Sequence, residues 1–393
     1  MSVENDLLLE SLGTGDNRER EKRVRALLNE DVDWTALAET ALKHRVIPLL
    51  YHSFMRLPDG WVPEEILQAM GYFVHSRAEF SQDATRQLCA VLDALRQNGI
   101  EALPIKGPVL ALQAYNQVGM RDYRDLDILV RKEDYPAVNS CLIRLGYKRE
   151  KWKTDLKAIA SWNYYGQDIF FHPQGHTSIE PHWLLAPSTF NIQLDFDLLS
   201  DRENSLSLNG LSMPVLSVEN QLLVLCVHGC KEQWIYLRQI CDLACLVVNN
   251  PELDWLYLLD RASRNNCLRM LHIGLYLAYI MLGLPLPKVV IDSIKSDETA
   301  IELAGRVAAD MFNDQRRHPD IYSVNRFRFR MRDRVRDAVI NVVKTWSMPS
   351  DKHFKMVTLP RFLTGGYFIV KIIHDSLMLP AWRIFKIFKR KVT

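Results

Sequence analysis

The chain has 393 residues, of which 48% are hydrophobic and 24% charged, and its formal net charge is only +2. This balance is that of an ordinary globular protein, and the length favours two or three domains over one small core. The small net charge excludes a global field that would commit the whole protein to nucleic acid or to acidic partners. Any preference for a charged ligand must therefore be local.

The N-terminus and the apolar runs show no sign of export or membrane insertion. The opening segment MSVENDLLLESLG lacks the positive charge and long apolar stretch of a secretory signal. The longest apolar run, residues 270–284, contains His272 and is shorter than the roughly 20 residues that cross a bilayer. Seven cysteines without export signals fit reduced thiols. We therefore expect a cytoplasmic protein.

Four of the cysteines raise the alternative of a zinc site. Cys226 and Cys230 are four residues apart, as are Cys241 and Cys245, and His228 lies among them. Structural zinc sites usually have tighter spacings on turns, whereas both pairs fall in apolar stretches with a helical pattern. Cysteine in such a stretch behaves as a small hydrophobic residue, so we favour packing over zinc.

The beginning of the chain has the pattern of helices. Apolar residues recur at intervals of three and four between residues 33 and 51. The pattern over residues 84–95 is again helical, and it ends at Asn98-Gly99, a common helix C-terminus. We assign residues 1–99 to an N-terminal helical region.

The pattern changes to short strands at residue 100. IEALPIKGP indicates a strand that runs into a turn, and DLDILV is a strong strand candidate. DIFFH and TSIEPHW flank the turn PQGH, so they are expected to pair as an antiparallel hairpin. We therefore predict an α+β protein in which residues 100–215 form a small α/β core and residues 216–393 form a C-terminal helical domain that closes over it.

The stretch from Ile105 to Val130 carries the most informative residues. Side chains alternate along a strand, so Asp125 and Asp127 share one face while Leu126 and Ile128 point into the core. Two carboxylates this close repel each other unless a cation lies between them, and oxygen ligands favour Mg²⁺ or Mn²⁺. Two such ions could hold the attacking and leaving oxygens of a phosphoryl group. The alternative is a solvated pair at the end of a strand.

Cations near this pair favour a metal–phosphate site. Lys106-Gly107, just after a strand, offers a close approach of the backbone and a positive charge suited to phosphate. Arg121 and Arg124 lie immediately before the carboxylates. Charges of both signs in one short stretch suit a site that binds a metal–triphosphate complex.

These motifs together resemble an uncharacterised nucleotidyltransferase family of the DNA polymerase beta-like superfamily. That family has a Leu/Ile-Lys-Gly turn, an arginine shortly before Asp-Ile-Asp-Leu-Leu-Val, and a later strand that reads Val-Glu-Leu-His-Trp. This chain has IKG, Arg121, DLDILV and IEPHW in the same order. The segments LLVLCVHGCKEQWIYLRQICDLACLV and HRVIPLLY are similar too, so the resemblance spans roughly residues 30–290.

The resemblance implies a polymerase-beta-like core and an ATP-binding transferase. Such an enzyme moves a nucleoside monophosphate from a magnesium nucleoside triphosphate to an acceptor and releases pyrophosphate. Asp125, Asp127 and Glu180 would bind the metal ions, and Glu180 would also take the proton of the acceptor. The resemblance assigns nucleotide contacts to five further residues: Lys106, Gly107, Arg121, Arg124 and His182.

Several residues near these motifs have open interpretations. Asp168, on another expected strand, is a rival of Glu180 for the third carboxylate. Pro181 stands where the family usually has leucine, and because proline cannot donate to a ladder, its strand should lie at an edge or should end there. We expect His228 and Asp242 to form hydrogen bonds within the helical domain.

Two basic segments bear on the partners. RFRFRMRDRVRD has an arginine at every second position from 326 to 336; a strand would make it a phosphate-binding ribbon, but the continuing helical pattern favours a helix. Residues 381–392 predict a basic amphipathic helix that packs on the protein or rests weakly on an anionic membrane surface, which would make the protein peripheral.

The function keeps two alternatives at this point. One is a nucleotide-binding or sensing module without turnover, although the joint presence of Lys106, Asp125, Asp127 and Glu180 argues against it. The other is a toxin-like nucleotidyltransferase that modifies RNA. The acceptor therefore stays open between a small molecule, a peptide and RNA.

Overall fold

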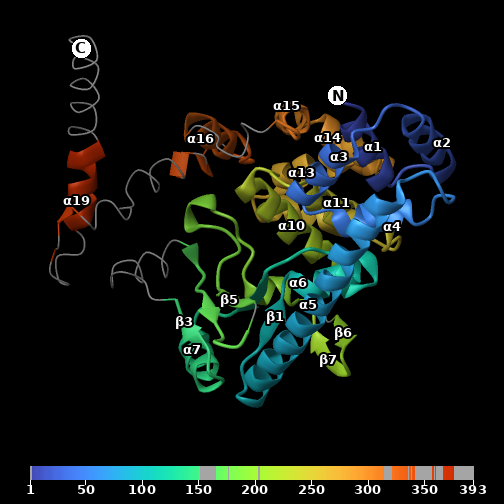
Figure 1. The fold of residues 1–393 in the computed structure, drawn as a ribbon. Coiled ribbons are helices and arrows are strands. Elements are labelled where there is room, and N and C mark those ends of the chain that lie inside the picture. The colour runs from blue at the N-terminus through green and yellow to red at the C-terminus, as the bar shows by residue number, and fades with distance from the viewer. Residues whose placement is uncertain are drawn as a thin grey trace, which may run out of the picture.

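A computed structural model describes most of the chain, namely residues 2–150, 165–175, 177–201, 204–313, 321–334, 336–337, 339–340, 356–357, 359 and 366–375. A five-stranded mixed sheet and a two-stranded hairpin are embedded among helices (Figure 1). This confirms the predicted α+β class.

Helices occupy the chain before the sheet. They are α1 (Val3–Leu12), α2 (Asn17–Leu28), α3 (Trp34–Lys43), α4 (Ile47–Phe54) and α5 (Glu64–Gln97). The side chains of Ser2, Asp16 and Asp33 cap α1, α2 and α3 by accepting hydrogen bonds from first-turn N–H groups. The predicted end of α5 at Asn98-Gly99 is confirmed, with Gly99 at φ +72°.

Helix α5 is 34 residues long and belongs to two hydrophobic cores. Near its start, Met70 packs in the larger core, which also contains α4. Further along, Leu88, Val91 and Leu95 pack in a smaller core under the sheet. Figure 1 shows α5 running from the N-terminal helices down past β1. One continuous helix therefore joins the N-terminal region to the sheet.

The sheet has the strand order β1-β2-β5-β4-β3. Its strands are β1 (Ala102–Pro104), β2 (Asp125–Val130), β3 (Lys148–Arg149), β4 (Phe170–Phe171) and β5 (Ser178–His182). The connections between them include α6 (Gly107–Tyr115), the 3₁₀ turn η1 (Val118–Met120) and α7 (Tyr135–Arg144). β2 and β5 are parallel and the other pairs antiparallel, so the predicted β4–β5 hairpin is confirmed.

Pro181 lies near the end of an interior strand. β5 is flanked by β2 and β4, so the expectation of an edge strand is wrong. The regular pairing with β4 stops at Ile179, and Pro181 is the second-last residue of β5. The carbonyl of Pro181 still accepts a hydrogen bond from the N–H of Asp168 (3.1 Å). Proline is tolerated because the regular β4–β5 pairs end at Ile179 and the contact with Asp168 uses the carbonyl of Pro181, which needs no N–H.

The two faces of β2 meet different surroundings. Leu126, Ile128 and Val130 join the smaller core, as the alternation predicted. The opposite face carries Asp127 and Leu129, and Leu129 belongs to the larger core, which includes α10. The carboxylate of Asp127 is therefore enclosed between the sheet and the helical domain.

The rest of the described chain is mostly helical. Its elements are η3 (Ser188–Phe190), α9 (Phe196–Leu199), β6 (Ser205–Leu208), β7 (Leu211–Pro214), α10 (Val218–Glu232), α11 (Leu237–Val248), α12 (Trp255–Arg264), α13 (Leu268–Leu282), α14 (Lys288–Lys295), α15 (Glu298–Ala309), α16 (Ile321–Arg330) and α19 (Gly366–Ile373). A Cβ at Gly229 or Gly274 would overlap the buried ring of Trp234, so glycine is required where α10 and α13 pack around it. Among the described residues, no helix has both the length and the hydropathy to cross a bilayer.

The arginine-rich stretch begins in a helix. α16 contains Arg326, Arg328 and Arg330, which confirms the predicted helix and contradicts the strand ribbon for this part. Arg330 pairs with Glu302, and the buried Arg332 donates to the carbonyl of Phe190, so both are used in internal contacts. The amphipathic segment 381–392 lies outside the described residues.

Candidate active site

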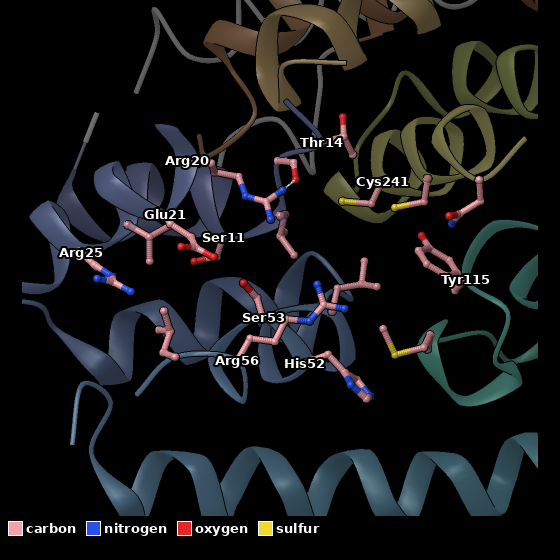
Figure 2. Close-up of a pocket in the computed structure, with 18 residues that line it drawn as sticks. Ser11, Thr14, Arg20, Glu21, Arg25, His52, Ser53, Arg56, Tyr115 and Cys241 are labelled. Atoms are coloured by element: carbon pink, nitrogen blue, oxygen red, sulfur yellow. Dashed lines mark hydrogen bonds between the residues drawn. The ribbon is translucent and has the colours of Figure 1, made fainter. Parts of the chain in front are cut away.

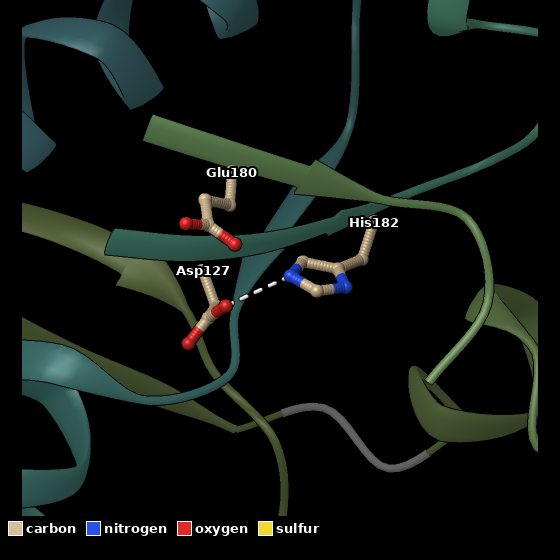
Figure 3. Close-up of side chains that lie close together, drawn as sticks. All are labelled: Asp127, Glu180 and His182. Carbon is tan, nitrogen blue, oxygen red and sulfur yellow. Dashed lines mark hydrogen bonds and ion pairs between the residues drawn. The ribbon is translucent and has the colours of Figure 1, made fainter. Parts of the chain in front are cut away.

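Three potential metal ligands meet on the neighbouring strands β2 and β5. The parallel register places Asp127 directly beside Glu180, and His182 follows two residues later on the same face of β5. One ligand atom from each residue lies within 4.8 Å of the others. Figure 3 shows the three side chains converging from the two strands. This is the one such group among the residues that the structure describes, and it contains none of the cysteines.

Asp127 and His182 are bonded to each other but keep unused atoms. His182 Nε2 lies 2.8 Å from Asp127 Oδ1, and both side chains are almost completely buried. Asp127 Oδ2 accepts no hydrogen bond and has the Lys106 ammonium at 3.7 Å. His182 Nδ1 also makes no hydrogen bond. Buried polar atoms are normally paired, so these two are candidates for contacts with a ligand.

The two carboxyl groups have opposite pKa shifts. Burial raises the pKa of Asp127, but Lys106 and His182 outweigh it and hold that pKa well below its usual range. Burial and the charges of Asp127 and Asp125 raise the pKa of Glu180 to about 8. Without a cation, the pair therefore holds one ionised and one protonated carboxyl at neutral pH.

The residues present fit a divalent cation. A cation between Asp127 and Glu180 would offset the repulsion that keeps Glu180 protonated, so both carboxylates could then ionise. It would also engage an unpaired oxygen of Asp127. Carboxylate oxygens are the ligands that Mg²⁺ and Mn²⁺ prefer. Asp125, at the exposed start of β2, lies two residues away on the same face.

The Lys-Gly turn lies at the start of α6, beside this cluster. Gly107 has φ +59°, and a Cβ there would lie 3.2 Å from Leu126 Cδ2, so glycine is required. Lys106 is the N-cap of α6 and gives it no side-chain cap. Pro108 has no N–H, so Gly107 and Val109 are the first residues of α6 whose N–H groups are left for another acceptor, and a helix N-terminus favours anions. Gln221 of α10 fixes the turn through a hydrogen bond to the carbonyl of Ile105 (2.8 Å).

His228 bonds across to the turn instead of within the helical domain, so that expectation is wrong. Lys106 Nζ lies 2.9 Å from His228 Nδ1. Burial, Lys106 and Lys231 hold the pKa of His228 well below its usual range, so the ring is neutral and accepts from Lys106. Its proton is then on Nε2, which is buried and makes no hydrogen bond. His228, Lys106 and Asp125 line a cavity of about 340 Å³.

Asp242 forms the expected hydrogen bond within the helical domain, to Arg238, and also bonds across to the α/β core. Its carboxylate accepts hydrogen bonds from Tyr115 Oη (2.8 Å), Arg121 Nε (3.0 Å) and Arg238 Nη1 (2.9 Å). Arg121 is only 4% exposed. Since Arg121 already pairs with Asp242, its clearest role in this structure is to join η1 to α11, and a contact with phosphate stays a prediction.

Two further residues lie apart from the metal-ligand group. Arg124 is exposed beside β2, so its expected contact with nucleotide also stays a prediction. Asp168, the rival third carboxylate, is buried elsewhere, where it pairs with Arg149 Nε (2.7 Å) and accepts from the Tyr135 hydroxyl. Asp168 is not part of the Asp127 group, and Glu180 is.

Lys231 is a site residue to which we gave no role from the sequence. It lies three residues after His228 on α10, hence on the same face of the helix. Burial and the charge of Lys106 lower the pKa of Lys231, whereas Asp127 and Glu180 raise it. Lys231 therefore lies in the field of both carboxylates. Its spacing from His228 was the available signal, but nothing in the sequence showed that this face of α10 covers the sheet.

A mixed sheet with two carboxylates on adjacent strands, beside a Lys-Gly turn that opens a helix, defines an α+β nucleotidyltransferase fold. The family model described as uncharacterised nucleotidyltransferase matches residues 30–283. That match covers more than half of the 393 residues, and the chain belongs to this family. A comparison with curated proteins finds no match.

Proposed function

We propose that the protein transfers a nucleoside monophosphate from a magnesium nucleoside triphosphate to an acceptor and releases pyrophosphate. The observation that carries this proposal is the pairing of Asp127 with Glu180 on parallel strands, next to the uncapped start of α6. The first feature suits a divalent cation and the second suits the phosphates that accompany it. Membership of a nucleotidyltransferase family supports the same reaction.

Asp127 and Glu180 would hold the metal, and Asp125 would share a second ion with Asp127. Magnesium or manganese, when bound, supplies Lewis-acid neutralisation of the phosphate charge. His182 would hold Asp127 in place through its 2.8 Å contact. These roles follow from the chemistry of the ligand atoms and from the way that the two strands present them.

The triphosphate would lie against the N-terminus of α6. The absence of a Cβ at Gly107 allows close approach, and the free N–H groups of the first turn provide donors. Lys106 and the unpaired Nε2–H of His228 add a charge and a further donor beside the same cavity. ATP is the nucleotide with which we would begin.

The transfer requires a bond from an acceptor oxygen to the α-phosphorus and loss of the bond to the pyrophosphate oxygen. Glu180, ionised once a cation offsets the charge of Asp127, would take the proton that the acceptor loses. The acceptor would be a small molecule, a peptide or, with less support, RNA. Arg330 and Arg332 engage Glu302 and Phe190, so they add little to the case for RNA.

The first experiment is calorimetric binding of a panel of nucleoside triphosphates with and without Mg²⁺, using the wild type and the Asp125→Ala/Asp127→Ala variant. We expect magnesium-dependent binding by the wild type and none by the variant. An α-³²P-labelled triphosphate then follows the transfer of label to candidate acceptors. Binding that ignores both magnesium and the double substitution would favour a sensing module, and no binding of any triphosphate by the wild type would refute the enzyme.

A further inference from the structure

A second cavity, of about 360 Å³, lies between the N-terminal helices and α11 (Figure 2). Its walls come from α1, α2, α4 and α11, and Tyr115 at the end of α6 contributes to one side. None of Asp127, Glu180 and His182 lines it. It is therefore a separate cavity from the candidate active site, and its residues have no role in the proposed transfer.

The charged side chains of this cavity are mainly cations. Arg20, Arg25 and Arg56 line it together with one carboxylate, Glu21, so three positive charges and one negative charge leave a formal +2. Burial and Arg56 lower the pKa of His52, which also lines the cavity, so His52 is neutral at pH 7. The excess positive charge therefore belongs to the arginines.

Arg20 and Arg56 lie on opposite walls of this cavity. Arg20 is partly buried, and its guanidinium donates to the carbonyl of Gly13. Arg56 forms no ion pair with any residue that the structure describes. Figure 2 shows both guanidinium groups directed from opposite walls toward the middle of the cavity. Burial and the charge of Arg56 lower the pKa of Arg20 although Glu10 and Glu21 partly offset them, and an anion between the two arginines would relieve the remaining repulsion.

The remaining walls suit an organic anion. Ser11, Thr14 and Ser53 provide hydroxyl groups, and Leu12, Val24, Leu49, Leu57 and Met120 provide apolar surface. The volume is near the lower end of the range for small-molecule sites. A formal charge of +2 matches a phosphate dianion better than a single carboxylate. The planar guanidinium of arginine can also donate two parallel hydrogen bonds to two phosphate oxygens.

We propose that this cavity binds a small phosphate monoester. The phosphate would lie between Arg20 and Arg56, and the organic group would lie on the apolar wall. Tyr115 separates the cavity from the candidate active site, because its hydroxyl donates to Asp242, which lines the cavity that also contains Asp125 and Lys106. Binding therefore requires neither magnesium nor Asp127, and the proposal does not depend on the proposed function.

The test is calorimetry of the full chain with phenyl phosphate in EDTA, with phenol and inorganic phosphate as comparison probes. We expect phenyl phosphate to bind more tightly than inorganic phosphate and phenol not to bind. Arg56→Gln should weaken phenyl phosphate at least about 10-fold, since it removes a charge-assisted contact. Arg18→Gln, an exposed position on the same helix α2 but outside the cavity, is the matched control and should change nothing.

Three results would overturn the proposal. One is that the wild type does not bind phenyl phosphate in EDTA; another is that Arg56→Gln binds it unchanged. The third is loss of binding in Asp127→Asn, which would place the probe at the active site. Circular dichroism and thermal melting check the fold of each variant. If Arg56→Gln unfolds, Arg56→Lys keeps the charge without the planar fork: weaker binding then supports the proposal and unchanged binding refutes it.

Discussion

Two buried clusters in this protein contain the same kinds of residue but differ in how completely they are bonded. One combines Asp127, His182 and Lys106 between the sheet and α10. The other combines Asp297, His272 and Arg269 among the C-terminal helices. Each pairs an aspartate with a histidine and a cation. The residue types alone would therefore assign the two clusters the same role.

No buried side-chain atom of Asp297, His272 or Arg269 lacks a hydrogen-bond partner. Asp297 accepts from Arg269 Nε (3.0 Å), from the N–H of Ala300 (3.1 Å) and from His272 Nδ1, while His272 Nε2 lies 2.9 Å from the Ser293 hydroxyl. In the other cluster, Asp127 Oδ2, His182 Nδ1 and the nearby His228 Nε2 make no hydrogen bond. Full pairing favours a structural role, whereas unpaired atoms that lie together beside a pair of carboxylates are candidates for contacts with a ligand.

The largest expected effect is on the affinity for ATP, which should depend on the Asp127 cluster and not on the Asp297 cluster. Asp127→Asn should weaken magnesium-dependent ATP binding by more than about 100-fold, because it removes a charged ligand from the metal site. The matched substitution Asp297→Asn should leave that affinity within about twofold. Titration calorimetry in Mg²⁺ measures both. If the two variants lost the same affinity for ATP, the loss would reflect overall stability, and the Asp127 cluster would have no special role in binding.

The next effect separates the clusters by stability. Asp297→Ala should lower the free energy of unfolding by about 3 kcal/mol, because it leaves Arg269 without its partner and removes the N-cap of α15. Glu180→Gln, measured in EDTA, should be neutral or stabilising, because burial beside Asp127 makes Glu180 take up a proton on folding at pH 7, a cost that Gln does not have. Urea unfolding at pH 7 gives both values. A large loss for Glu180→Gln would contradict the view that this cluster is strained without a cation.

The two clusters should respond to pH in opposite directions when metal is absent. Glu180 has a folded pKa raised from 4.5 to about 8, so its contribution to stability is lost as the pH rises through that interval. Burial raises the pKa of Asp297, but His272 and Arg269 lower it below 3.8 overall, so its contribution is lost as the pH falls below about 4. Thermal melts from pH 3 to 9 in EDTA test this. Glu180→Gln should remove only the slope between pH 4.5 and about 8, and Asp297→Asn only the slope below about pH 4.

The smallest expected effect comes from removing one hydrogen bond from the Asp297 cluster, which leaves it with an unpaired buried atom like those of the Asp127 cluster. Ser293→Ala leaves His272 Nε2 without its partner and should cost about 1 kcal/mol. Ser296→Ala, at an exposed hydroxyl that bonds only a local carbonyl, is the control and should cost less. Urea unfolding measures the difference between the variants. If the two variants lost the same free energy of unfolding, the contact between His272 and Ser293 would make no measurable contribution to stability.

Side-chain periodicity and turn signals predicted much of the fold from the sequence. Alternation along DLDILV placed Leu126 and Ile128 in the core, and Asn98-Gly99 marked the end of α5. The turn between β4 and β5 indicated their antiparallel pairing. Each of these features depends on residues that are close in the sequence, where periodicity and turn chemistry act.

The parts of the site that escaped prediction depend on contacts between distant segments. Lys106 meets His228 across 122 positions of the chain, and Arg121 meets Asp242 across 121. The sequence pattern around one residue gives no information about a partner so far away in the chain, so His228 and Asp242 were both assigned to hydrogen bonds within the helical domain. Glu180 was placed beside Asp127 by resemblance, and the parallel β2–β5 register that joins them has no signal within either strand.

The length of α5 also constrains how the molecule can move. At about 1.5 Å per residue, its 34 residues form a rod roughly 50 Å long, anchored at Met70 in one core and at Leu95 in the other. An unbroken helix resists bending, so α5 holds the N-terminal helices and the sheet together as one rigid unit.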